Sequence, residues 1–348
     1  MENETPFLTD GVFHMETSPT IPEDFRCGYA TIIGEPNVGK STLMNGLLQQ
    51  KISIVTNKPQ TTRHKILGIL SGEGHQVVFL DTPGIIKPRY LLQEAMMQFA
   101  TSAMADADVL LFMIDATSPK MDKDLAHEEA FSRLQGMQKP VLLVINKSDA
   151  VKKGGILPII DFYSKAFPFK EILPISALKL DGTAELLKEI IRLLPQHPPF
   201  YPLDIVSEAS ERFFVAEIIR EKIFMKYKEE IPYSATVDIV EFKEREVGLR
   251  ARLPFGTLRG GQAGGSRLVG SPQAGKTFIS ADIYVERDSQ KGILIGKHGG
   301  ALKEIGRMAR TDIEKFLQRP VFLEMHVKVR PDWRRDDTWL ARLGYRQS

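Results

Sequence analysis

The sequence predicts an α/β domain with a doubly wound, mostly parallel sheet, followed by a smaller α+β domain. Over the first 195 residues, short apolar runs alternate with helix-length segments, which is the pattern of a doubly wound sheet. A proline-dense stretch at 195–202 ends this alternation and is typical of a linker. Near the C-terminus, residues 321–329 alternate between apolar and polar side chains, so this strand should cover a core on one face only.

Composition places the chain among globular proteins of two or three domains. It has 348 residues, of which 43% are hydrophobic and 26% are charged. The single cysteine, Cys27, excludes an internal disulfide and suits a reducing compartment. No apolar run approaches the roughly 20 residues of a membrane span. Residues 1–23 are acidic and lack Lys and Arg, so we expect a disordered leader and a cytoplasmic protein, or a plastid or mitochondrial one if the true N-terminus is missing.

A phosphate-binding loop is predicted at 34–42. Its pattern, G-x-x-x-x-G-K-S, lies between an apolar run that reads as a buried strand and a segment with helical apolar spacing. Backbone N–H groups at such a helix N-terminus favour anionic phosphate. Lys40 adds a positive charge for the outer phosphates, and the Ser41 hydroxyl is a ligand that suits Mg²⁺. The predicted phosphate-binding residues are Gly34, Glu35, Pro36, Asn37, Val38, Gly39, Lys40, Ser41 and Thr42.

Three further motifs follow predicted strands, where ligands of such sheets bind. They are Asp81-Thr82-Pro83-Gly84, Asn146-Lys147-Ser148-Asp149 and Ser176-Ala177-Leu178. The Asp149 carboxylate can accept two hydrogen bonds from the ring N–H and the amine of guanine, which adenine cannot offer. We expect Asn146 and the Lys147 stem to hold the base and the Ala177 amide to reach the guanine carbonyl oxygen. These motifs therefore predict a guanine nucleotide.

With GEPNVGKS, QTTRH, DTPG, NKSD and SALK in this order, the first domain resembles the translation-factor-related P-loop GTPases. The segment PQTTRHKILGI is similar to the Era subfamily in particular. The resemblance implies GTP or GDP and Mg²⁺ as cofactors. It implies that Thr61 or Thr62, with Thr62 preferred, completes the Mg²⁺ shell begun by Ser41, that Asp81 holds Mg²⁺ through water, and that the Gly84 amide senses the γ-phosphate. The segments around these residues should be switches.

Ile85 stands where Ras-like enzymes carry the glutamine that orients the attacking water. Hydrolysis should therefore depend on positioning and charge. The family resemblance implies that Asn37 coordinates K⁺ near the β and γ phosphates. We expect slow, K⁺-stimulated GTP hydrolysis, with Asn37, Lys40, Thr62 and Gly84 as the catalytic group.

The second domain carries a glycine turn, Gly296-Lys297-His298-Gly299, ahead of a predicted basic helix. We expect a first amphipathic helix that Pro232 closes, then strands at 233–242, 278–285 and 321–329. G-x-x-G in the order α-β-β-α-α-β resembles a type II KH domain, whose turn approaches about four nucleotides of a single strand. The resemblance implies RNA binding by Gly296, Lys297, His298, Gly299, Lys303, Arg307 and Arg310. Residues 288–348 carry 13 Lys and Arg against 8 Asp and Glu, which also favours an anionic partner.

The predicted domains are a GTPase domain at 24–198, a linker at 199–207, a KH domain at 208–335 and a C-terminal segment at 336–348. Residues 248–275 form a Gly/Arg-rich insertion, which we expect to be disordered unless it is a sequence artefact such as a retained intron. A second G-x-x-x-x-G-K-T pattern at 270–277 leads into a predicted strand, which offers no helix N-terminus, so we expect it not to bind nucleotide.

The family resemblance implies a GTP-hydrolysing switch that binds small-subunit, 16S-type ribosomal RNA and assists rRNA maturation and assembly of the 30S-type subunit. It also implies peripheral membrane association, and we expect a monomer. An alternative is an RNA-binding adaptor whose nucleotide pocket switches but barely hydrolyses GTP. A GTPase of tRNA modification or membrane transport would share the phosphate loop but lack the KH domain.

Overall fold

The computed structural model describes residues 21–56, 58–121, 129–152, 154–244 and 276–346. These residues form two sheets, one of six strands and one of three. The predicted insertion at 248–275 lies outside the described residues, and so does the predicted leader apart from residues 21–23.

The first domain is built on the six-stranded sheet, whose strand order is β2-β3-β1-β4-β5-β6. Only β2 runs antiparallel to its neighbour, so the expected doubly wound, mostly parallel sheet is confirmed. The elements are β1 (Arg26–Ile33), α1 (Lys40–Leu48), β2 (Ile66–Gly72), β3 (His75–Asp81), α2 (Leu91–Asp106), β4 (Val109–Asp115), α3 (Glu129–Ser132), β5 (Val141–Asn146), α4 (Leu157–Ala166), β6 (Glu171–Pro174) and α5 (Thr183–Leu193).

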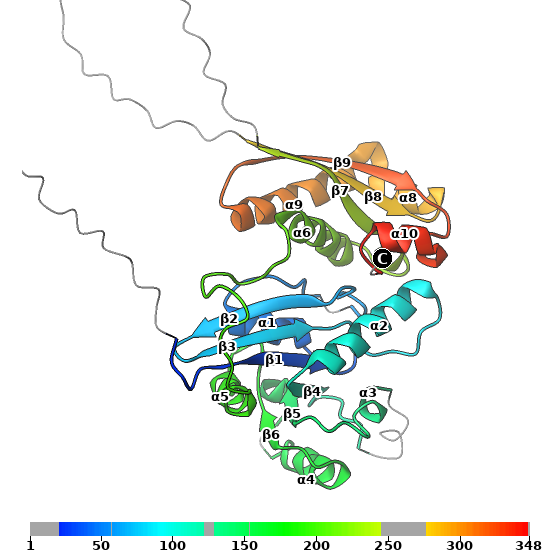
Figure 1. The fold of residues 1–348 in the computed structure, drawn as a ribbon. Helices are drawn as coiled ribbons and strands as arrows, with labels where there is room; N and C mark the ends of the chain where they lie inside the picture. Colours follow the sequence, from blue (N-terminus) through cyan, green and yellow to red (C-terminus); the bar gives the residue numbers. More distant parts are fainter. Residues whose placement is uncertain (1–20, 57, 122–128, 153, 245–275, 347–348) are drawn as a thin grey trace, which may run out of the picture.

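Helices cover both faces of this sheet, as Figure 1 shows. One core cluster joins α2 and α4 to the sheet, and the other joins α1 and α5 to its opposite face. Strands β4 and β5 are buried almost throughout, which explains why they read as continuous apolar runs. With both faces covered, the loops after the strands remain available for a ligand.

The second domain places its three-stranded sheet in the order β7-β8-β9, with β8 antiparallel to β7 and parallel to β9. The order of elements confirms the predicted type II KH topology. They are α6 (Glu211–Lys226), α7 (Ile231–Ser234), β7 (Thr236–Glu244), β8 (Thr277–Val285), α8 (Asp288–Ile295), a 3₁₀ turn η3 (Lys297–Gly299), α9 (Gly300–Leu317), β9 (Val321–Val329), a 3₁₀ turn η4 (Trp333–Arg335) and α10 (Asp337–Arg342).

Two expected boundaries in this domain are wrong. Helix α6 ends at Lys226, well before Pro232, because the chain becomes extended at Tyr227. Pro232 instead lies near the start of α7, where the ring fits because the first N–H groups of a helix have no partner. Residues 231–234 form this short helix, so the strand predicted from residue 233 begins at Thr236.

The sheet of the second domain covers a core on one face only. On β9, Val321 and Val327 are buried while Phe322, Glu324 and His326 are exposed, which confirms the predicted alternation. Helices α6 and α9 lie against the buried face (Figure 1). Thr277 begins β8, the central strand of this sheet, so the described end of the second glycine pattern enters a strand as expected.

Helix α6 is buried on two faces, because it lies between the KH core and the first domain (Figure 1). Its apolar residues Val215, Ile219 and Ile223 belong to the KH core. On its other face, residues at helical spacing contact the segment 51–63 of the first domain. They are Arg220, Glu221 and Phe224. The prediction of a simple amphipathic helix was therefore incomplete.

The part of the chain after β9 also joins the two domains. The buried side chains of Trp333, Leu340 and Tyr345 belong to the core cluster that contains residues of α2. The Tyr345 ring stacks on His64 with centroids 4.4 Å apart. The end of the described chain therefore packs against the first domain.

Candidate nucleotide and nucleic-acid sites

A cavity of about 530 Å³ lies beyond the carboxyl ends of β1, β3 and β5. The structure brings most of the predicted nucleotide-binding residues to its wall. They are Pro36, Asn37, Gly39, Lys40, Ser41, Thr42, Thr62, Gly84, Asn146, Lys147, Asp149 and Leu178. The other predicted residues stand outside this lining: Gly34, Glu35, Val38, Asp81, Thr82, Pro83, Ser176 and Ala177.

Glycine is required at two positions around the cavity, because the backbone there passes too close to other atoms to leave room for a Cβ. Gly39 caps α1 with φ of 105°, and a Cβ there would lie 2.2 Å from Nδ2 of Asn146. A Cβ on Gly84 would lie 2.7 Å from the backbone nitrogen of Pro36. Only glycine permits these approaches, which bring the loops after β1, β3 and β5 together around the cavity.

Lys40 is buried and points back along the phosphate-binding loop. Its Nζ donates hydrogen bonds to the carbonyl oxygens of Gly34 at 3.1 Å and Glu35 at 2.8 Å. Burial lowers the pKa of Lys40 to about 8, although the nearby charges of Asp81 and Glu35 act in the opposite direction. Such a lysine gains from an anionic ligand, which would stabilise its charged form.

Three hydroxyl and carboxylate groups converge beside the loop. Ser41 Oγ donates to Asp81 Oδ2 at 2.7 Å and lies 3.0 Å from Thr62 Oγ1. The second carboxylate oxygen of Asp81 is buried and has no hydrogen-bond partner among the described residues. Burial raises the pKa of Asp81, and a cation beside it would stabilise the charged form. Hard oxygen donors and an unsatisfied carboxylate oxygen fit Mg²⁺.

The two candidate threonines lie in the segment 58–63, the predicted switch segment, and face different partners. The Thr61 hydroxyl donates to the carbonyl oxygen of Lys58 at 2.7 Å and lies 2.8 Å from the Thr56 hydroxyl. Only the Thr62 hydroxyl lies beside Ser41. The geometry therefore favours Thr62 over Thr61 as the Mg²⁺ ligand.

The opposite end of the cavity carries Asp149, whose side chain is 21% exposed. A hydrogen bond from the Ser176 hydroxyl keeps the pKa of Asp149 below its usual value, and Lys179 Nζ lies 3.5 Å away. An ionised carboxylate at this place can accept the two N–H groups of guanine. Lys147 Nζ forms an ion pair with Asp115 at 2.5 Å, which leaves its stem along the cavity wall.

One predicted base contact is not supported by the geometry. The N–H of Ala177 already donates to Oδ1 of Asn146 at 2.9 Å, and Ala177 does not line the cavity. Asn146 forms two hydrogen bonds with neighbouring loops: its Nδ2 donates to the carbonyl oxygen of Val38, and its Oδ1 accepts from the N–H of Ala177. Sequence reasoning could not distinguish these internal contacts from contacts with the base.

Ile85 is a core residue, with 3% of its surface exposed and its N–H donating to the carbonyl oxygen of Gly34 at 3.2 Å. It therefore contributes no polar group to the cavity. Gln60, which the sequence reasoning passed over, lines the cavity beside Thr62 and Gly84. Its Oε1 accepts a hydrogen bond from Nε2 of Gln93 on α2 at 3.2 Å. Its position directly before Thr61 and Thr62 is the feature of the sequence that could have indicated Gln60 as a cavity residue.

The glycine turn of the second domain projects its polar residues outward. Gly296 and Gly299 have φ of 69° and 75°, and Lys297 and His298 between them are exposed. A Cβ on Gly296 would lie 2.5 Å from that of Ala301. Helix α9 follows directly and exposes Lys303, Arg307 and Arg310. The predicted RNA-binding residues thus form one basic face, the turn face, made of 297–298 and these three side chains.

Comparison with known proteins agrees with this arrangement. Residues 29–147 match the family model described as 50S ribosome-binding GTPase, and residues 269–334 match the KH domain model. GTPase Era of Geobacter metallireducens is 44% identical over 321 residues, which span 92% of this chain and 98% of that protein. The chain belongs to the Era family of GTPases. Membership in the Era family makes it a GTP-hydrolysing enzyme with a C-terminal KH domain.

Other Era proteins extend the comparison. A chloroplastic Era GTPase of Zea mays is 41% identical over 340 residues, which cover 97% of this chain and 75% of that protein. A crystal structure of an Aquifex aeolicus Era variant bound to GDP·AlF4⁻ matches with a TM-score of 0.80 and 39% identity. Era in complex with MgGDPNP and nucleotides 1506–1542 of 16S ribosomal RNA matches equally well. Both structures cover 93% of this chain and are matched over their whole length.

Among the described residues, no helix is both long enough and apolar enough to cross a membrane.

Proposed function

We propose that the chain is a GTP-controlled switch that binds small-subunit, 16S-type ribosomal RNA through its KH domain. In this role it assists assembly of the 30S-type subunit and maturation of its RNA. One observation carries the proposal: residues 54–56, 58 and 60–62 line the nucleotide cavity, and Val55 and Thr61 among them also form hydrogen bonds with α6 of the KH domain. A single segment can therefore respond to the nucleotide and to the RNA-binding domain. The Era complex with 16S RNA supports the choice of RNA.

In the proposed nucleotide site, one end of the cavity binds the base and the other end binds the phosphates. Asp149 selects guanine, and the loop 34–42 holds the phosphates. Ser41, Thr62 and, through water, Asp81 would hold Mg²⁺, which supplies positive charge to the phosphates during hydrolysis. Lys40 neutralises the outer phosphates, and the Gly84 amide contacts the γ-phosphate.

We also propose that hydrolysis is slow and K⁺-stimulated, with Asn37 as the K⁺ ligand. Asn37 lines the cavity and has a φ of 67°, a left-handed conformation that asparagine tolerates better than most residues. Ile85 cannot orient water. A monovalent cation beside Asn37 would then supply positive charge to the phosphates, which the apolar Ile85 side chain cannot do.

The proposed domain boundaries are 24–198 for the GTPase domain, 199–207 for the linker, 208–335 for the KH domain and 336–348 for the C-terminal segment. The linker packs on the first domain: the Ser207 hydroxyl donates to the carbonyl oxygen of Leu67 at 2.6 Å, and Ile69 N–H donates to that of Val206 at 2.7 Å. Peripheral membrane association, a monomeric state and the compartment stay predictions. Chloroplastic relatives favour a plastid as the alternative to the cytoplasm.

The function is tested by single-turnover GTP hydrolysis with and without a 16S-type RNA fragment, combined with RNA crosslinking. We expect hydrolysis above the buffer rate. Hydrolysis no faster than in buffer, under every K⁺ and RNA condition, would instead favour the adaptor alternative.

RNA binding is best tested on the turn face. A Gly296→Asp variant would strain the backbone itself, so a loss of binding there would be ambiguous. The double variant Lys297→Asp, His298→Asp reverses the exposed charge and should reduce crosslinking about tenfold or more. Lys188→Asp, an exposed residue on α5, is the control. Equal crosslinking by the double variant and the control would contradict RNA binding at this turn.

A further inference from the structure

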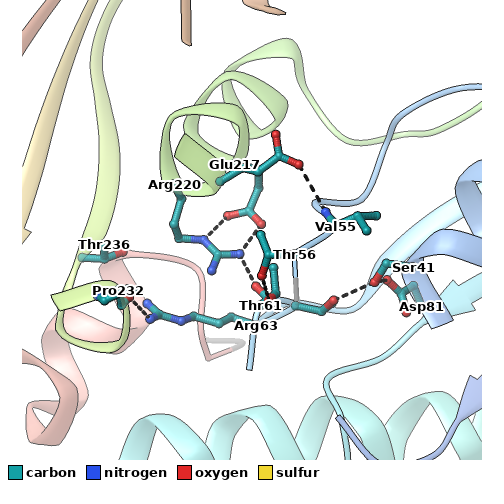
Figure 2. A network of polar contacts seen from close by, with 12 residues as sticks. Ser41, Val55, Thr56, Thr61, Arg63, Asp81, Glu217, Arg220, Pro232 and Thr236 are labelled. Atoms are coloured by element: carbon teal, nitrogen blue, oxygen red, sulfur yellow. Dashed lines mark hydrogen bonds and ion pairs between the residues drawn. The ribbon is translucent and has the colours of Figure 1, made fainter. Parts of the chain in front are cut away.

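Arg220 of the KH domain reaches into the switch segment of the GTPase domain (Figure 2). Its Nη2 donates to the carbonyl oxygen of Thr61 at 2.5 Å. Its side chain, 1% exposed, is also paired with Glu217 one turn earlier on α6, at 2.8 Å through Nε and 2.5 Å through Nη2. The peptide unit that precedes Thr62 is therefore held by the second domain.

The residue on the other side of Thr62 is held in the same way. Arg63 is buried, and its guanidinium donates to three backbone carbonyl oxygens of the KH domain, those of Pro232 at 3.0 Å, Tyr233 at 3.1 Å and Ala235 at 2.9 Å. Figure 2 shows Thr61 and Arg63 between the KH domain and the pair of Ser41 and Asp81. The short segment that carries Thr62 is thus attached to the KH domain on both sides.

The chemistry of Arg220 suits this position. A buried charge is tolerated only when it is paired and hydrogen-bonded, and Glu217 supplies the opposite charge. The guanidinium packs over the Phe224 ring, 5.4 Å from its centroid. Its planar fork can bond a carboxylate and a carbonyl oxygen at once, which a lysine ammonium does less well.

We propose that Arg220 is a positioning residue for the GTP-bound state: it fixes the Thr61 carbonyl so that the Thr62 hydroxyl faces Ser41 and Asp81. This inference rests on the proposed role of Thr62 as a Mg²⁺ ligand in the GTP state. Arg220 would act through Thr62 and touch no reacting atom. GDP binding, which lacks the γ-phosphate that orders this segment, should depend on Arg220 far less.

The test compares full-length wild type with Arg220→Met in the presence of Mg²⁺. We expect the Kd for a non-hydrolysable GTP analogue to rise tenfold or more relative to the Kd for GDP, because a charged hydrogen bond is lost only where Thr62 is used. The Mg²⁺ concentration for half-maximal hydrolysis should rise in parallel. Arg220→Lys, which keeps one donor, should restore part of the difference.

A matched control distinguishes the positioning role of Arg220 from a purely structural one. Lys328 of β9 pairs with the buried carboxylate of Asp282 of β8 at 2.6 Å, an ion pair that lies within the KH domain. Lys328→Met should lower the melting temperature and leave the GTP-to-GDP affinity ratio unchanged. If Arg220→Met lowers both affinities equally, or leaves their ratio as in wild type, the inference is wrong. If Arg220→Met does not fold, the ratio of GTP-analogue affinity to GDP affinity is measured for Arg220→Lys instead. A ratio equal to that of wild type would then contradict the inference.

A Thr62→Ala variant distinguishes failure of the inference from failure of the proposed site. An unchanged affinity ratio in Thr62→Ala would contradict the Mg²⁺ role of Thr62 and, with it, the inference. A changed ratio in Thr62→Ala together with an unchanged ratio in Arg220→Met would contradict the inference alone.

Discussion

The side-chain amide of Asn146 donates a hydrogen bond to the carbonyl oxygen of Val38 at 2.7 Å, joining residues 108 positions apart. Its other end accepts the N–H of Ala177 at 2.9 Å. Asn146 therefore joins the loop proposed to hold phosphate to the two loops proposed to hold the base. These contacts hold the loops together within the protein itself.

Replacing Asp149 with Asn should change the base that the cavity prefers. An amide in place of the carboxylate loses two charge-assisted hydrogen bonds to guanine, so GTP affinity should fall about 10²-fold or more. The same amide can donate to the carbonyl oxygen that xanthine carries in place of the guanine amine. Competition binding of GTP and XTP measures the effect. A variant that still prefers GTP would show that Asp149 does not read the base.

The motifs predicted the wall of this cavity because each is contiguous in sequence and follows a strand. Lys40, Asp149 and Gly84 needed only the rule that ligands lie beyond strand ends. The contacts of Arg220 could not be predicted, because it meets Thr61 across 159 residues and because the charged side of an amphipathic helix reads as a solvated face. Only the packing of α6 between two domains shows that this face is buried.

The pKa of Lys40 gives nucleotide binding a definite pH dependence. Burial lowers it to about 8, and bound phosphates should raise it again. Below pH 8 the lysine is already protonated, so this group leaves the affinity unchanged. Above pH 8 binding must take up a proton, and the affinity should fall by up to about tenfold per pH unit.

Two measurements check this effect of Lys40. Nucleotide affinity should be followed from about pH 7 to pH 9, and calorimetry in buffers of different ionisation enthalpy should show proton uptake above pH 8. Stability of the free protein should respond in the opposite sense. The unfolded state, with a lysine pKa of 10.5, binds more protons between pH 8 and 10.5, so this group makes stability rise with pH there. An affinity that stays constant to pH 9 contradicts the assignment.

Introducing glutamine at position 85 should not create a Ras-like active site. The Ile85 side chain is buried in the core, and its N–H is fixed to Gly34. Ile85→Gln would bury an amide without partners, costing about 1–3 kcal/mol of stability. We expect a lower melting temperature and no increase in kcat, with Ile85→Leu as the volume-matched control. A rise in kcat at unchanged stability would show that this side chain can reach the cavity.

The identity of the monovalent cation should matter for hydrolysis through Asn37. Single-turnover rates with wild type should be about tenfold or more higher in K⁺ than in Na⁺, since tenfold needs only about 1.4 kcal/mol of added transition-state stabilisation. Asn37→Gly is the sharper variant than Asn37→Ala, because glycine accepts the φ of 67° without strain while removing the side-chain oxygen. The variant should hydrolyse GTP equally slowly in both salts, with GDP affinity preserved. Equal wild-type rates in K⁺ and Na⁺, or a K⁺ effect that persists in Asn37→Gly, would exclude Asn37 as the cation ligand and leave the missing charge to be supplied from elsewhere in the cavity.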